Sequence, residues 1–175
     1  LSGYGEIIKT ALLDSETLLY GALAALEDGD YSRYLYPVIA VKRRIVQADP
    51  NESGLRKCLN LGHTVGHALE ELNHYPHGYA VIYGIVAALY LSVVKTGLKK
   101  EWLTLLCHIM IDYYGKPVCR CRDYEQLLSL MQADKKNTVP GEVSFTLLKR
   151  VGEPVTDVPV SKPEIIEALD YLFSV

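Results

Sequence analysis

Apolar side chains recur every three or four residues along most of the 175-residue chain, which predicts a mainly helical fold. Ile7, Ile8, Ala11 and Leu12, for example, share one face of a helix. Glycine and proline punctuate this pattern and indicate where several helices end. The expected helices lie within residues 7–12, 18–26, 38–48, 54–72, 77–97, 100–114 and 124–133, and after residue 161.

The pattern changes once, near residue 143. Apolar residues at 143, 145 and 147 alternate with Ser144 and Thr146, which predicts a short strand that pairs with residues 155–160. The last helix has a complete start signal, with Ser161 as N-cap and Glu164 three residues later. The sequence contains no internal repeat and no low-complexity linker. We therefore expect one mainly α domain over residues 1–175, with a small β ribbon.

Composition narrows the possible functions. The formal net charge is −3 and the pI is about 6.0, which gives no electrostatic footprint for nucleic acid or an anionic membrane. The uncharged stretch 78–94 is shorter than the roughly 20 residues of a membrane helix, so we expect it to be buried. The cysteines suggest reduced thiols in the cytoplasm rather than disulfides; they are Cys58, Cys107, Cys119 and Cys121.

Four of the five histidines lie within fifteen residues, at positions 63, 67, 74 and 77. His63 and His67 are four residues apart, so on one helix both could reach the same small ligand. The spacing is that of the H-E-x-x-H zinc-protease motif, but Thr64 stands where that motif needs its glutamate base. Clustering of this kind favours metal binding or catalysis over a surface or core role. The missing glutamate base at position 64 excludes the protease mechanism.

Glycines at 62 and 66 accompany these histidines. Each costs a helix roughly 1 kcal/mol relative to alanine, which indicates a close approach at this point. A neighbouring helix backbone and a ligand explain the approach equally well.

A carboxylate and several cations complete the candidate chemistry. Glu6 and Lys9 project together from an apolar stretch; spacing alone favours an exposed ion pair, although Glu6 could join two histidines in a zinc site. Arg56 and Asn60 are expected on the helical face of His63 and His67. The cations Lys9, Lys42 and Arg56, together with the Asp-Lys-Lys-Asn stretch at 134–137, suit an anionic, phosphorylated or carboxylated ligand.

At these residues the chain resembles the 3-dehydroquinate synthase family. The resemblance covers nearly the whole chain in order and is most specific in the stretch L-N-L-G-H-T-V-G-H. The matching segments are SGYGEIIK at 2–9, residues 42–49, ESGLRKCLNLGHTVGHALE at 52–70, His77-Gly78 and DKKN at 134–137.

The resemblance implies a function in the shikimate pathway, the conversion of 3-deoxy-D-arabino-heptulosonate 7-phosphate into 3-dehydroquinate and phosphate. NAD is reduced and regenerated within each turnover, and a zinc or cobalt ion is bound by a glutamate and two histidines. On this chain the implied metal ligands are Glu6, His63 and His77, which removes His67 from the ligand set suggested by spacing. The implied catalytic residues are His67, Lys9 and Lys42, and the implied substrate-binding residues are Arg56, Asn60, Lys135 and Lys136.

The matching region is the C-terminal, metal-binding domain of that family, and we see no NAD-binding motif before Glu6. We therefore expect the isolated 175 residues to lack synthase activity, and the complete enzyme to be a cytoplasmic homodimer. The family commonly has a glutamate after the His-Gly pair, where this chain has Tyr79. Because His77 is retained, we expect altered surroundings rather than altered chemistry.

Three alternatives remain open from the sequence. One is another sugar-phosphate cyclase of the same superfamily, which would keep the metal ligands but vary the substrate contacts. Another is a helical domain that only binds metal or a protein partner. The third is a relative of iron-dependent alcohol dehydrogenases, whose sites are usually richer in histidine and aspartate.

Overall fold

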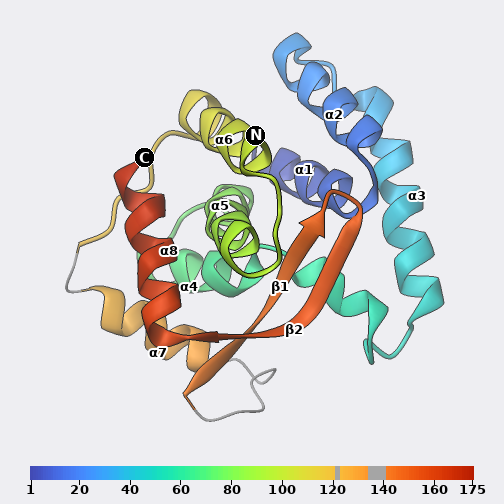
Figure 1. Ribbon diagram of the computed structural model, residues 1–175. Helices are drawn as coiled ribbons and strands as arrows, with labels where there is room; N and C mark the ends of the chain where they lie inside the picture. Colours follow the sequence, from blue (N-terminus) through green and yellow to red (C-terminus); the bar gives the residue numbers. More distant parts are fainter. Residues whose placement is uncertain (121–122, 134–140) are drawn as a thin grey trace.

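The computed structural model describes residues 1–120, 123–133 and 141–175, and confirms a mainly helical fold with one two-stranded ribbon (Figure 1). The first half contains α1 (Ser2–Asp14), α2 (Glu16–Asp28), α3 (Ser32–Ala48), the 3₁₀ helix η1 (Leu55–Asn60) and α4 (His63–Asn73). The second half contains α5 (His77–Lys95), α6 (Lys100–Ile109), the π-helical turn η2 (Met110–Tyr114), α7 (Tyr124–Gln132), β1 (Glu142–Arg150), β2 (Glu153–Ser161) and α8 (Lys162–Ser174).

Helix α5 forms the centre of the molecule. It packs against α1, α4, α6, α8 and β1, and it is drawn in the middle of these elements in Figure 1. By length and composition α5 could cross a membrane, but 72% of its most apolar window is buried inside the protein. The expectation of a buried helix at this stretch is therefore confirmed.

The ribbon closes one side of the core. Strands β1 and β2 are antiparallel, with Val143 opposite Val160 and Arg150 opposite Glu153, so the predicted pairing is correct but both strands are longer. At the tip, Gly152 (φ +82°) donates its backbone N–H to the carbonyl of Leu12 at 2.8 Å. This bond fastens the ribbon to the end of α1.

Several predicted helix ends are confirmed by local chemistry. Gly29 ends α2 in the left-handed conformation, and Gly97, also left-handed, follows the C-cap of α5. The capping box of Ser161 and Glu164 starts α8 as predicted. The expectation that α3 starts after Pro37 is wrong, because the helix begins at Ser32 and contains the proline. Proline costs this helix one backbone bond, to the carbonyl of an exposed residue four positions earlier.

The prediction of one continuous helix over residues 54–72 is also wrong. The chain forms η1, leaves the helical conformation at Leu61 and Gly62, and starts again as α4 at His63. Gly62 has φ +77°, which glycine adopts without the steric cost that other residues meet. Arg56 and Asn60 therefore do not share a helical face with His63 and His67.

Candidate metal centre

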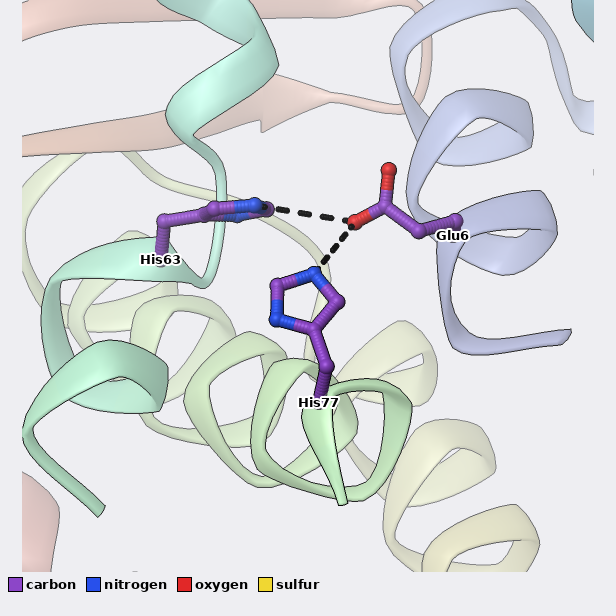
Figure 2. A group of neighbouring side chains, drawn as sticks. All are labelled: Glu6, His63 and His77. Atoms are coloured by element: carbon purple, nitrogen blue, oxygen red, sulfur yellow. Dashed lines mark ion pairs between the residues drawn. The ribbon is translucent and has the colours of Figure 1, made fainter. Parts of the chain in front are cut away.

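Three side chains from distant parts of the sequence converge on one point, and we call Glu6, His63 and His77 the donor triad (Figure 2). Glu6 lies on α1, whereas His63 and His77 are the first residues of α4 and α5. The Nε2 atoms of the two histidines each lie 3.6 Å from Oε1 of Glu6. The structure therefore brings together the three residues that the family resemblance implied as metal ligands.

Glycines beside the triad allow the backbones to approach this closely. A Cβ on Gly78, next to His77, would lie 1.6 Å from the carbonyl oxygen of Ser2. A Cβ on Gly5, next to Glu6, would lie 2.4 Å from the Gly78 carbonyl oxygen. Contact between α1 and α5 at these two glycines therefore sets the spacing of Glu6 and His77.

Helices α4 and α5 meet in the same way. A Cβ on Gly84 would lie 1.8 Å from the Gly62 carbonyl oxygen, and a Cβ on Gly66 would lie 2.9 Å from that of Ala80. The sequence left open whether a helix or a ligand explains Gly62 and Gly66. In the structure the backbone of α5 packs against Gly62 and Gly66, so a helix explains these glycines. This contact also positions His63.

Both histidines of the triad have a partner at Nδ1. His63 Nδ1 lies 3.2 Å from the carbonyl oxygen of Leu61, and His77 Nδ1 lies 2.9 Å from Oε2 of Glu70. Because a carbonyl and a carboxylate only accept hydrogen bonds, a neutral imidazole in either position carries its proton on Nδ1. The lone pair is then on Nε2, the atom that faces Glu6.

The surroundings of Glu6 and His63 favour the protonation states in which these side chains can bind a metal cation. Burial by itself would raise the pKa of Glu6, but the Lys9 ammonium, 2.9 Å from both carboxylate oxygens, together with His63 and Lys42, outweighs burial and lowers that pKa. Burial lowers the pKa of His63 to about 4, and nearby Lys9 acts in the same direction. Near neutral pH, Glu6 is therefore a carboxylate and His63 a neutral imidazole.

These features fit a divalent metal. Two imidazole nitrogens and one carboxylate oxygen form a common catalytic zinc set, which leaves one position open. Ligand atoms about 2.0–2.1 Å from a tetrahedral zinc are about 3.4 Å from one another. The two 3.6 Å separations in the triad are close to that value.

His67 lies beside the triad rather than in it. Its ring centroid is 4.7 Å from that of His63 and 6.1 Å from that of His77, and its side chain is exposed. It also belongs to a second group of potential ligand atoms, with Glu70 and His77. His67 is therefore a solvent-exposed residue at the edge of the candidate centre.

Lys9 is buried and lies inside the site. Its Nζ is 3.5 Å from Nε2 of His63 as well as 2.9 Å from Glu6. Burial lowers the pKa of Lys9, whereas the Glu6 carboxylate opposes this shift. The prediction of Glu6 and Lys9 as an exposed ion pair, which spacing alone favoured, is wrong because Lys9 is buried and its side chain is only 3% exposed.

Three other predicted polar residues are the two cations Lys42 and Arg56 and the neutral Asn60, and we call these three the cation rim below. Lys42, on α3, places Nζ 3.6 Å from Oε2 of Glu6, and its side chain is 52% exposed. Arg56 donates to the carbonyl of Pro50 at 2.9 Å, and Asn60 donates to Oε1 of Glu52 at 3.2 Å.

Within the described residues, Arg56 and Asn60 form no hydrogen bond or ion pair with the triad. Lys135 and Lys136 lie outside the residues that the structure describes.

Sequence reasoning missed two carboxylates that organise this region. Glu70, the partner of His77, lies seven residues after His63 on α4, a helical spacing that could have identified it. Asp49 accepts backbone N–H bonds from Ser53, Gly54 and Arg56, and these bonds hold its pKa well below its usual range. Asp49 thereby shapes the turn that leads to Arg56, and its apparent role as a helix stop concealed this.

Comparison with known proteins gives one consistent result. The family model described as 3-dehydroquinate synthase C-terminal matches residues 3–137. A 3-dehydroquinate synthase of Parabacteroides distasonis is 42% identical over 182 residues, covering 98% of this chain and 51% of that protein. Another, from Leptospira interrogans, is 40% identical and is covered to 48% of its length. The chain thus spans about half the length of the curated relatives it matches.

Solved structures with the same fold are more distant in sequence. A 2-deoxy-scyllo-inosose synthase complexed with carbaglucose-6-phosphate, NAD⁺ and Co²⁺ superposes with a TM-score of 0.75 at 18% identity, covering 96% of this chain and 51% of that one. A 2-epi-5-epi-valiolone synthase from Streptomyces hygroscopicus with NAD⁺ and Zn²⁺ bound gives 0.76 at 23% identity, covering 98% and 50%. At these identities the likeness concerns the fold alone.

Proposed function

Because the chain belongs to the 3-dehydroquinate synthase family, we propose that it forms the metal- and substrate-binding part of a 3-dehydroquinate synthase. The complete enzyme would convert 3-deoxy-D-arabino-heptulosonate 7-phosphate into 3-dehydroquinate and inorganic phosphate. The observation that carries the proposal is the convergence of Glu6, His63 and His77 beside a buried lysine.

The donor triad would hold a zinc or cobalt ion. Once bound, the ion would act as a Lewis acid that lowers the pKa of a substrate hydroxyl. Glu6 supplies a carboxylate oxygen, and the Nδ1 partners of His63 and His77 keep their Nε2 lone pairs directed at it. The glycine contacts hold the three donors in place before any ion arrives, which favours tight binding.

The substrate carries a carboxylate and a phosphate, and the chain offers cations for both. Lys9 would bind the substrate deep in the site, next to the triad, while Lys42 and Arg56 would bind it at the opening with help from Asn60. Lys135 and Lys136 are proposed as further substrate contacts. His67, which is exposed beside His63, would move a proton between the substrate and solvent.

The remaining chemistry requires a hydride acceptor. We propose that NAD binds mainly to a part of the enzyme outside these residues, where it would supply reversible hydride transfer. The net reaction involves no oxidation, since the substrate atoms are fully accounted for by 3-dehydroquinate and phosphate. We further propose a homodimer in the cytoplasm, where the free thiols of Cys58 and Cys107 would persist.

Metal analysis tests the centre directly. After loading with zinc and desalting, the chain should retain one ion, measured by mass spectrometry, whereas Glu6→Ala, His63→Ala and His77→Ala should each lose it. The exposed His108→Ala, on α6, is the matched control and should retain the ion. Unchanged zinc content in Glu6→Ala would contradict the proposal.

A phosphate-release assay tests the reaction. The chain alone, supplied with NAD, zinc and 3-deoxy-D-arabino-heptulosonate 7-phosphate, should release no phosphate. Addition of the N-terminal half of the Parabacteroides distasonis relative should restore release, because that half supplies what the chain does not match. Turnover by the chain alone would refute the assignment of NAD binding to the other half.

The competing function is another sugar-phosphate cyclase, which the solved structures of the same fold suggest. Identities of 36–42% to 3-dehydroquinate synthases, against 18–23% to the other cyclases, favour the synthase. A panel of sugar phosphates that lack the carboxylate separates the two. Preference for such a substrate would establish the alternative.

A further inference from the structure

The two histidines of the donor triad are held in place differently. His63 is mostly buried, with 14% of its side chain exposed, and its Nδ1 meets a backbone carbonyl. His77 is 44% exposed, and its Nδ1 meets the carboxylate of Glu70 at 2.9 Å. The packing that surrounds His63 is therefore largely missing around His77, and the bond to Glu70 takes its place.

From this contrast we infer that Glu70 is a positioning residue for the metal centre. Its carboxylate fixes the Nδ1–H tautomer of His77, orients Nε2 toward Glu6 and increases the electron-donating strength of the ring. His63 needs no such group, because burial and the fixed carbonyl of Leu61 restrain it. The inference rests on the proposed metal centre and adds a residue to it.

The fold places Glu70 for this role. It lies two turns after His63 on the same face of α4. His74 ends α4 in the left-handed conformation (φ +56°), and α5 begins only three residues later, at His77. The short reversal returns the first residue of α5 to the carboxylate of Glu70, so both partners stand on helices that pack closely together.

The charges around the centre support the same role. The ammonium groups of Lys9 and Lys42 both lie within 4 Å of the Glu6 carboxylate. Two such cations oppose the arrival of a metal ion. Glu70 adds a negative charge behind His77 and offsets part of that repulsion without occupying a coordination position.

Cobalt titration of the metal-free chain, followed by visible absorption, tests the inference. Glu70→Ala should weaken cobalt binding about 10- to 100-fold, the usual effect of losing such a partner. Glu70→Gln keeps an acceptor oxygen without the charge, so it should recover part of the affinity and the wild-type spectrum. The exposed neighbour Glu71→Gln is the matched control and should bind as the wild type.

Three results would be decisive against the inference or its premise. Wild-type affinity and spectrum in Glu70→Ala, with binding abolished in His63→Ala, would overturn the role of Glu70 alone. A second such result is that the wild-type chain binds two cobalt ions, whereas Glu70→Ala and His67→Ala each bind only one. That result would make Glu70 a ligand of a second ion and would also overturn its role as a positioning residue. Unchanged binding in His63→Ala would instead refute the metal centre itself.

Discussion

The donor triad and the cation rim occupy neighbouring parts of one site, but they are built in different ways. Glu6, His63 and His77 are fixed by backbone contacts between α1, α4 and α5, where glycines leave no room for a side chain. Lys42, by contrast, extends from an exposed face of α3, and Arg56 is held by a local turn. Donors thus need accurate spacing before the ion binds, whereas long cationic side chains can adjust to a substrate after it enters.

The most severe way to break this contrast is to separate α1 from α5. Gly78→Ala would force a Cβ to within 1.6 Å of the Ser2 carbonyl oxygen, so the helices must move apart. We expect a loss of about 3 kcal/mol in the free energy of unfolding and at least tenfold weaker zinc binding. Urea denaturation and zinc titration measure the two effects.

Gly3→Ala is the matched control for Gly78→Ala. It lies on α1, and nothing lies within 4 Å of the added Cβ. Its free energy of unfolding should stay within about 0.5 kcal/mol of the wild type. If Gly78→Ala behaves like this control, backbone contact does not set the spacing of the triad.

The triad could be predicted from sequence only in part. Clustering marked His63 and His77 as candidates, and the family resemblance supplied Glu6 and removed His67 from the ligand set. Spacing alone misjudged Lys9, because this lysine is buried beside His63, which lies 54 residues further along the chain. Long-range packing of this kind leaves no local signal.

The rim was predicted less well for a related reason. A helical pattern continues through residues 54–72, but Gly62 approaches α5 and adopts a left-handed conformation that interrupts it. From the sequence, Asp49 only marked the end of a helix. The structure shows that its carboxylate accepts hydrogen bonds from three backbone N–H groups of the following turn. Tertiary contact thus overrides local propensity at the positions that aim Arg56 and Asn60.

A second, smaller effect comes from pH. In the folded, metal-free chain burial lowers the pKa of His63 to about 4, whereas in the unfolded chain it stays near its usual 6.5. Between pH 6.5 and 4 the unfolded state therefore binds more protons, so the free energy of unfolding falls as the pH falls. The loss should be on the order of 2 kcal/mol, since His63 is partly screened by solvent.

Urea denaturation of chelator-treated protein at several pH values measures this dependence. His63→Gln should flatten the curve across that window, while the exposed His108→Gln should follow the wild type. An equal pH dependence in wild type and His63→Gln would show that His63 does not cause the loss of unfolding free energy at low pH.

The smallest effect on stability is expected at the rim. Lys42→Met removes a half-exposed ion pair with Glu6, and such pairs contribute at most about 1 kcal/mol. The variant should keep its melting temperature and zinc content, yet lose at least tenfold in phosphate release by the reconstituted enzyme. Arg43→Met, on the same exposed stretch of α3, is the control. Loss of zinc from Lys42→Met would remove the distinction between rim and triad.

The burial of α5 has a consequence for how the protein is made. During translation this apolar helix leaves the ribosome before α6, β1 and α8, three of the elements that pack against it. Until the thirteen-residue helix α8 has emerged and docked, the nascent chain presents an apolar surface to which chaperones bind and at which chains aggregate. A ribosome that stalls before α8 is complete would therefore leave a product prone to precipitate, even though every donor of the triad had already been synthesised.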